Sequence, residues 1–447
     1  MKIQLPYSRR RRYLTGIDWS IGMLDYISRL QTGVGNLSQV ILEVEGMIEP
    51  TRLTDALAKI SGRLPLIHGC VARDWLNLAP YWRVPQLAHT AVIPLQVVDL
   101  AIGRSSEADS LFADHVNRPL ESQTQHLRFL LIRIGIERSR LGMVFDHRLF
   151  DACGAEAFLQ LIQETSQGRL ELIASQVRQI EPPHLNEWRR QFLGGQTVNR
   201  FRLQLAGRDV AALAMPPRRP GRRVRFLHDS LTPAQTSQFI EFAALETGVP
   251  ILLPSAIARA VSAMHVAMPS VSQRGAQYLV AVSVDARSPD QKWEQLLFNH
   301  LSFLGFSVSP ELSESTSGLV DAFRDQLWEQ MRVGVPQAFQ DATMLTRICP
   351  HWIAGRVARL TFKGRVCSFY FACLRDSAFT GDSFMGLRTI NLIHTPRVPP
   401  PPGVGLCMTF FDGRLNIVLS YLDGVMEDPL AMTVLQQFKQ RLISCVS

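Results

Sequence analysis

Apolar residues recur along the chain with two different periods. The segment SQVILEVEG (38–46) is rich in branched apolar residues and predicts a strand. The segment LTDALAKI (53–60) follows, and its apolar residues have the spacing of one helical face: Leu53, Ala56, Leu57 and Ile60. The alternation of such strand and helix signals predicts a mixed α/β (α+β) fold.

A hairpin and a helix are predicted in the middle of the first half. Two apolar segments, 127–136 and 141–147, flank the polar tetrapeptide ERSR (137–140), and this pattern indicates an antiparallel hairpin. A helix is then expected after Asp151, with Ala155, Phe158, Leu159 and Ile162 on one face.

The second half repeats the alternation after a less regular segment, 166–228, which ends in a Pro/Arg-rich stretch. A helix is expected from Pro233, because Thr232 can cap it and Gly248 can end it. Strands are expected at 278–287 and within 403–421, where Asp412-Gly413 makes a hairpin turn, and the last helix begins at Asp428. We therefore divide the chain into an N-terminal lobe (1–207), a basic linker (208–228) and a C-terminal lobe (229–447).

Composition is that of a globular protein. The chain has 447 residues, of which 46% are apolar and 19% charged, so a large core is expected and extensive disorder is not. No run of about 18 uncharged apolar residues is present, so no transmembrane segment is expected. The seven cysteines are scattered, without CxxC pairs or zinc spacing, which favours a reduced cytoplasmic protein without a metal site.

The net charge of +8 is concentrated in two arginine-rich stretches, Arg9–Arg12 and residues 216–225. An export signal is not expected after Arg12, because the following residues include Asp18, Asp25 and Arg29 in place of an apolar segment. The basic stretches contain no interleaved aromatic residues, so we expect no nucleic-acid binding. Positive charge can still favour an anionic partner such as coenzyme A or an acidic carrier protein.

The segment GMVFDHRLFDACGAEAFLQLI (142–162) holds the main candidate for chemistry. His147 ends an apolar strand, and Asp151 follows four residues later, at the start of the predicted helix. Because the residues before His147 predict a strand, the chain must turn before Asp151. We therefore expect Asp151 to point away from His147 and to anchor the turn.

This segment resembles the HHxxxDG motif of the condensation-domain superfamily, which also contains chloramphenicol acetyltransferase and the HxxxD acyltransferases. Here the motif is DHRLFDA. Three further blocks resemble the superfamily in the same order: GIDWSIGMLD with VGNLSQVILEVEG, VSVDAR with LFNHLSFLGFSVSP, and the long segment FMGLRTINLIHTPRVPPPPGVGLCMTFFDGRLNIVLSY.

The resemblance implies a pseudo-dimer of two chloramphenicol-acetyltransferase-like lobes with a tunnel between them. His147 would lie midway along the tunnel as the catalytic general base. It would take a proton from an amine or hydroxyl that attacks an acyl thioester. The resemblance also supplies Arg287, at the end of VSVDAR, as the structural partner of Asp151.

Three positions depart from the pattern of the superfamily. Asp146 replaces the first histidine, and strand alternation predicts that it faces away from His147, so that Asp146→His should be tolerated. Ala152 replaces a glycine, which would cause strain if the position required a positive φ. Leu374-Arg375 stands where relatives often have Ser-Asn.

Other residues are weaker candidates. Together with Asp146 and Ala152, residues Asn299, Ser302 and Ser420 are candidates for lining the tunnel or stabilising an oxyanion, although Asn299 could equally be structural. Cys153 lies at the start of the helix, where a nucleophile is conceivable, but packing is the more common role of such a cysteine.

The function expected from the sequence is a freestanding acyltransferase of natural product biosynthesis. No carrier-protein serine motif or phosphate-binding loop is present, so donor and acceptor must come from outside the chain. The donor is expected to be an acyl-phosphopantetheine carrier protein or an acyl-coenzyme A, with no bound cofactor, and the enzyme is expected to be a monomer. The alternative is a catalytically degenerate docking module that binds an acylated carrier protein.

Overall fold

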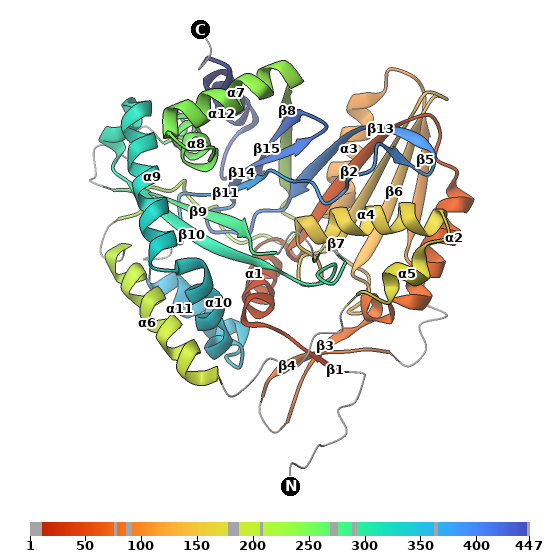
Figure 1. Ribbon diagram of the computed structural model, residues 1–447, viewed down its shortest axis with the longest axis horizontal. Helices are drawn as coiled ribbons and strands as arrows, with labels where there is room; N and C mark the ends of the chain where they lie inside the picture. The colour runs from red at the N-terminus through yellow and green to blue at the C-terminus, as the bar shows by residue number, and fades with distance from the viewer. Residues whose placement is uncertain are drawn as a thin grey trace.

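The computed structural model describes residues 11–75, 78–85, 92–177, 187–205, 209–268, 276–287, 291, 293–361 and 365–444. In these residues the strands form two six-stranded sheets and one three-stranded sheet. Figure 1 shows the two large sheets side by side, with helices covering each of them.

The first large sheet has the strand order β12-β13-β2-β7-β6-β5. Its strands are β2 (Leu37–Glu45), β5 (Leu95–Leu100), β6 (Leu127–Ile134), β7 (Arg138–Asp146), β12 (Ser383–Phe384) and β13 (Leu387–Pro396). The helices α2 (Pro50–Arg63) and α4 (Ala152–Ser166) bury their apolar stripes against one face, and α3 (Ser105–Asn117) packs on the other. The short helix α5 (Leu170–Ala174) lies beside α2 and α4.

The second large sheet has the order β10-β9-β11-β14-β15-β8. Its strands are β8 (Val224–Leu231), β9 (Tyr278–Asp285), β10 (Leu301–Val308), β11 (Phe369–Leu374), β14 (Val404–Phe411) and β15 (Arg414–Leu422). Its core lies under four helices, α7 (Pro233–Thr247), α8 (Leu253–His265), α9 (Thr316–Arg332) and α12 (Asp428–Ile443).

Most of the remaining elements lie in the lower part of Figure 1. They are the small sheet of β1 (Arg11–Tyr13), β4 (Pro80–Arg83) and β3 (Cys70–Arg73), and the helices α1 (Gly16–Thr32), α6 (Trp188–Leu205), α10 (Val335–Thr346) and α11 (His351–Thr361). Two short 3₁₀ helices, η1 (Pro65–His68) and η5 (Pro310–Glu314), complete the described elements. Helix α1 packs against α10 and α11 and lies near the centre of the molecule.

Most of the predicted elements are confirmed. Helix α7 has Thr232 as its N-cap and Gly248 as its left-handed C-cap, as the sequence predicted. The strands β14 and β15 form a hairpin around Asp412-Gly413, where both residues have positive φ. The β6–β7 hairpin is also present, but its predicted turn (137–140) is wrong, because residues 138–140 continue β7. Paired with β2, these residues let Arg138 contact Glu43.

The sequence prediction of an irregular segment at 166–228 is wrong for α6. Gly194 and Gly195 in the middle of this segment weaken the helix signal. In the structure Gly194 serves packing, because a Cβ atom on it would lie 2.8 Å from the carbonyl oxygen of Ala338 in α10. The close approach of α6 to α10 therefore explains a glycine that local propensity disfavours.

Two elements cross the boundaries that the sequence suggested for the lobes. The strands β12 and β13, from residues 383–396, belong to the first sheet, and α6, from residues 188–205, packs on α10 beside the second. The strand β8 begins at Val224, inside the proposed linker. The division into 1–207, 208–228 and 229–447 remains a prediction. In the structure, each of the two proposed lobes contributes an element that packs with the other lobe.

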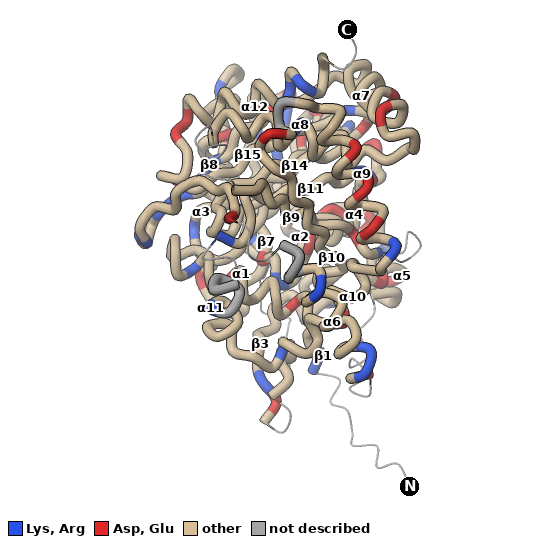
Figure 2. The backbone as a smooth tube through the Cα atoms, turned by 90° about the vertical axis from the view of Figure 1, so that its left-hand side faces the viewer, with Lys and Arg blue, Asp and Glu red and all other residues tan. Residues whose placement is uncertain are grey.

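Charged residues of both signs are interspersed along the backbone (Figure 2). In the basic stretch, Arg223 pairs with Asp114, and Arg225 pairs with Asp423 and Asp428. Much of this positive charge is therefore used in contacts within the protein. No helix in the described ranges is long and apolar enough to cross a membrane.

Candidate active site

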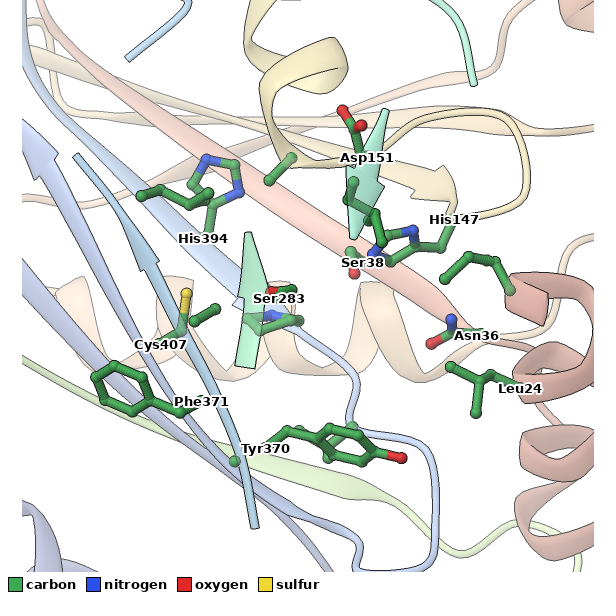
Figure 3. Close-up of a pocket in the computed structure, with 18 of the residues that line it drawn as sticks. Leu24, Asn36, Ser38, His147, Asp151, Ser283, Tyr370, Phe371, His394 and Cys407 are labelled. Atoms are coloured by element: carbon green, nitrogen blue, oxygen red, sulfur yellow. The ribbon is translucent and has the colours of Figure 1, made fainter. Parts of the chain in front are cut away.

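A cavity of about 170 Å³ lies between the two large sheets. Its wall includes Ser38 and Phe145 from the first sheet, and Ser283, Tyr370 and Cys407 from the second. Helix α1 adds Ile21 and Leu24. Figure 3 shows His147 extending into this space from one side. The cavity occupies the place where the sequence predicted a tunnel between two lobes.

The end of β7 places His147 in the cavity wall. The strand stops at Asp146, whose carbonyl oxygen accepts hydrogen bonds from the backbone N–H groups of Leu149 (2.9 Å) and Phe150 (3.2 Å). These bonds close a turn between the strand and α4. The backbone N–H of His147 donates to the carbonyl oxygen of Asn36 at 3.2 Å, which fixes the first residue of the turn.

Asn299 sets the orientation of the His147 ring. The amide nitrogen of Asn299 donates to the carbonyl oxygen of His147 (2.9 Å) and to Asp18 Oδ1 (3.3 Å). Since both partners accept hydrogen bonds, the amide oxygen must face the other way, where it lies 3.1 Å from His147 Nδ1. In the neutral ring, Nδ1 therefore carries the proton and donates it to Asn299.

The same geometry leaves Nε2 of His147 available as a base. Nε2 has no hydrogen-bond partner among the described residues and is not enclosed by protein atoms. Because His147 lines the cavity, this nitrogen opens onto it, as the ring direction in Figure 3 indicates. A histidine whose tautomer is fixed in this way, with its other nitrogen facing a cavity, is suited to accept a proton there.

The backbone before Asn299 is held in an uncommon conformation. Phe298 has a φ of 77° although it is not a glycine, and it is 1% exposed. Its N–H donates to the carbonyl oxygen of Leu149 at 2.6 Å. Asp18, in the capping box of α1, also accepts from the backbone N–H of Asn299 at 3.1 Å. Such a conformation costs about 1–3 kcal/mol, and here it delivers Asn299 to His147.

The structure brings Asp151 and Arg287 together. The two terminal nitrogens of Arg287 donate to the two carboxylate oxygens of Asp151 at 2.8 and 2.6 Å. Asp151 also caps α4 by accepting from Gly154 N–H, and it accepts from His300 N–H at 2.9 Å. Burial raises the pKa of the Asp151 carboxyl, but Arg287 and the hydrogen bonds outweigh burial, so that the pKa is lowered.

Asp146 faces away from the cavity, and its buried carboxylate contacts two other side chains. Its carboxylate contacts Arg148 (2.6 Å) and His126 Nδ1 (2.9 Å), while His126 Nε2 lies 2.7 Å from the carbonyl oxygen of Gly69. His126 therefore has one acceptor beside each ring nitrogen, the carboxylate of Asp146 and the carbonyl oxygen of Gly69. Burial opposes ionisation of Asp146, but Arg148 and His126 outweigh it and hold its pKa well below the ordinary value.

These contacts correct one prediction for Asp146. The residue does not line the cavity, so it is no tunnel or oxyanion group. The tolerance of Asp146→His stays a prediction, and the contacts of the buried carboxylate with Arg148 and His126 argue against it. Strand alternation gave the correct direction of the side chain and no information about its partners.

Ala152 and Cys153 line the cavity at the start of α4. Ala152 is the first helical residue and does not have a positive φ, so replacement of the glycine causes no backbone strain there. Cys153 donates to Asp285 at 3.4 Å. Burial, and then the carboxylates of Asp151 and Asp285, raise the pKa of the Cys153 thiol well above its ordinary value, which opposes a role as nucleophile.

Asn299, Ser302 and Ser420 do not line the cavity, and for the two serines the predicted oxyanion role fails for this reason. The Ser302 hydroxyl donates to the carbonyl oxygen of Pro336 at 2.7 Å, so it supports the contact of β10 with α10. Ser420 is buried within β15. Of the pair Leu374-Arg375, Leu374 lines the cavity, whereas Arg375 contacts the carbonyl oxygen of Pro250.

Several polar residues of the cavity wall were missed from the sequence: Asn36, Ser38, His394 and Arg397. Arg397 is 4% exposed, and burial lowers its pKa to about 9. His394 lies in β13 within an apolar run. A polar residue in such a run is the one feature of the sequence that could have indicated a role for it. Its partner Glu156 is on the buried side of α4, which the helical pattern did not predict.

Comparison with known proteins gives the fold. No family model matches the chain, and neither does any curated protein. The first condensation domain of the CDA synthetase is 15% identical, with a TM-score of 0.70 over 98% of this chain and 97% of that one. The EpoB NRPS cyclization-docking bidomain from Sorangium cellulosum is 15% identical, with a TM-score of 0.65 over 98% of this chain and 85% of that one.

The epimerization domain from the third module of tyrocidine synthetase B is 12% identical, with a TM-score of 0.64 over 98% of this chain and 97% of that one. The chain therefore has the condensation-domain fold, and the predicted fold class is confirmed. The names of these three structures refer to condensation, cyclization and epimerization. The fold alone therefore leaves the reaction of this chain to be inferred from its own site.

Proposed function

We propose that the protein is an acyltransferase that moves an acyl group from a thioester to an amine or hydroxyl acceptor, with His147 as general base. The observation that carries the proposal is the state of the His147 ring. Asn299 accepts from Nδ1, and Nε2 opens onto the cavity between the two sheets.

The reaction needs one well-placed base. His147 Nε2 takes the proton as the acceptor nitrogen or oxygen attacks the thioester carbonyl. The carbon–sulfur bond then breaks, and the same proton passes to the departing sulfur. No covalent acyl-enzyme is required, because the thioester is already activated. General-base assistance of this kind contributes about 10²–10⁴ in rate.

The start of α4 supplies candidate groups for the developing oxyanion. The first backbone N–H groups of a helix have no partner within the helix and carry a partial positive charge. Ala152 and Cys153, which line the cavity, stand at this position in α4. Of the predicted oxyanion candidates, Ala152 alone keeps this role in the proposal, through its backbone rather than its side chain.

The donor is proposed to be an acyl-phosphopantetheine carrier protein or an acyl-coenzyme A, in natural product biosynthesis. The similar structures include a condensation domain of the calcium-dependent antibiotic synthetase in complex with a substrate analogue. Apart from its polar groups, the cavity wall is apolar and includes Leu24, Phe303 and Leu406, a setting suited to an acyl chain.

The experiment is to incubate the purified protein with a panel of acyl-pantetheine and acyl-coenzyme A thioesters and a panel of amines and alcohols. Free thiol and the intact mass of the product are measured together. His147→Ala should abolish both signals, whereas His68→Ala, outside the cavity wall, should not. Thioester binding without turnover in any combination would refute the enzyme and favour a docking module instead.

A further inference from the structure

A second histidine, His394, faces the same cavity from the opposite side (Figure 3). It lies in β13, is 3% exposed and contacts the carboxylate of Glu156 in α4, with 2.7 Å between His394 Nε2 and Glu156 Oε1. Neither residue takes part in the chemistry assigned to His147. A buried histidine held by a buried carboxylate at a cavity wall therefore needs its own explanation.

The contacts of Glu156 fix which His394 nitrogen carries a proton. The other carboxylate oxygen accepts from the backbone N–H of Ala378 (2.6 Å) and from the hydroxyl of Ser377 (2.7 Å). An ionised carboxylate accepts at both oxygens, and here the backbone N–H and the hydroxyl already donate to one of them. His394 Nε2 therefore carries the proton that it donates to Glu156. In the neutral ring, Nδ1 is then left with a lone pair.

That lone pair opens onto the cavity. His394 Nδ1 has no hydrogen-bond partner in the part of the chain that the structure describes, and it is not enclosed by protein atoms. Apolar residues of the same cavity wall include Ala372 and Leu406, and its polar residues include Ser38 and Ser283. Burial raises the pKa of the Cys407 thiol to about 12, so it remains uncharged. Glu156 thus fixes Nδ1 as a hydrogen-bond acceptor that faces the cavity.

We propose that His394 Nδ1 recognises a hydrogen-bond donor on the acyl group of the thioester, away from the reacting carbonyl. The inference rests on the proposed function and names its substrate class: acyl chains with a hydroxyl or an amino group, in preference to plain hydrocarbon or keto chains. The acyl group fits this position, because an apolar chain can lie along the wall while its polar group meets Nδ1. His394 is then a specificity residue, and Glu156 is the residue that positions it.

The substitution Glu156→Gln tests the inference without changing the volume of the side chain. The Ala378 N–H can only donate, so the amide oxygen of glutamine must take the place beside it. The amide NH₂ group must then face His394 Nε2, which becomes an acceptor, and the proton moves to Nδ1. The substitution therefore turns the cavity-facing nitrogen from an acceptor into a donor, and the preference for the ligand should reverse.

The probes are S-alkyl pantetheine thioethers of one chain length, which cannot react. Each bears a hydroxyl, an amino, an oxo or no polar group, and the group is moved along the chain. Binding is measured by calorimetry. At the matching position the wild-type protein should bind the hydroxyl or amino compound about tenfold or more tightly than the oxo compound. Comparison of the hydroxyl with the amino compound identifies which of the two donors the site takes.

In the Glu156→Gln protein the oxo compound should become the tighter ligand. The substitution Glu164→Gln, in the same helix but outside the cavity wall, should leave the order unchanged. The ¹⁵N resonances of the His394 ring should show the proton on Nε2 in the wild type and on Nδ1 in Glu156→Gln. The position of the ring proton can be read from these resonances even if the substitution lowers the stability of the protein.

Two outcomes separate this inference from the proposed function. If hydroxyl, amino, oxo and plain thioethers bind equally well to the wild type at every position, the role of His394 is refuted and the acyltransferase proposal stands. If no thioether binds while the protein is folded, the pantetheine donor itself is refuted, and with it the site proposed for its acyl group.

Discussion

The guanidinium of Arg287, just after β9 of the second sheet, forms a two-bonded ion pair with Asp151, the N-cap of α4 on the first sheet. Both side chains are buried, with 9% and 6% of their surface exposed. The pair joins the two halves of the molecule immediately after the turn that holds His147. It therefore links the assembly of the two sheets to the placement of the base.

We predict that Asp151→Ala and Arg287→Ala each lower the free energy of unfolding by about 3–5 kcal/mol, because each leaves one buried charge without its partner. The double variant should lose less than the sum of the two single variants. Chemical denaturation of the four proteins measures the cycle. Strictly additive losses would mean that the two residues do not stabilise each other.

The lowered pKa of Asp151 also predicts a dependence of stability on pH. A carboxyl group whose pKa is lower in the folded state than its unfolded value, about 3.9, stabilises the protein above that value. The stabilisation is lost as the pH falls toward the folded-state pKa. The difference in unfolding free energy between wild type and Asp151→Asn should therefore be constant near neutral pH and begin to shrink below about pH 5. A difference that stays constant throughout the acid range would contradict the shift.

A histidine at position 146 should destabilise the protein. In Asp146→His, the new imidazole would replace the carboxylate that both Arg148 and His126 contact, and Arg148 would be left with Asp25, 4.0 Å away. We expect a loss of about 3–5 kcal/mol, as when one partner of a buried ion pair is removed. The melting temperature measures this, and Asp99→His, on the exposed edge strand β5, is the control. An unchanged melting curve for Asp146→His would show that the charge is not needed.

Asn299 should matter for the rate more than for substrate binding. Without its amide oxygen, the neutral ring of His147 is free to place the proton on either nitrogen, and only one tautomer serves as base. We expect Asn299→Ala to lower kcat by about 10- to 10²-fold, part of the total effect of a general base, with KM little changed. Steady-state kinetics on the best thioester tests this. A rise in KM with an unchanged kcat would instead assign Asn299 to substrate binding.

The sequence was informative where one local pattern determines one local structure. Thr232, Pro233 and Gly248 defined α7, and the motif order defined the turn between His147 and Asp151. The sequence failed where the reason lies in a distant element. Gly194 of α6 serves the contact with α10, and Glu156 is buried because it meets His394 from a strand more than 200 residues away.

The same distinction holds within the candidate site. Strand alternation correctly turned Asp146 out of the cavity, but its partners come from residue 126 and from the turn itself, which no periodicity shows. Ser302 was chosen because it lies in a block that resembles the superfamily, and Ser420 because it ends a predicted strand. Which face of a strand meets the cavity depends on how the two sheets pack, and that is a property of the whole fold.

The most direct test of the central claim is the rate of thiol release by His147→Ala, measured on the thioester and acceptor that the wild type uses best. We predict that kcat/KM falls by about 10²–10⁴-fold with an unchanged melting temperature, because the variant lacks only the base. A folded variant that retains more than about half of the wild-type activity would contradict the account, since the general-base contribution of His147 would then be negligible.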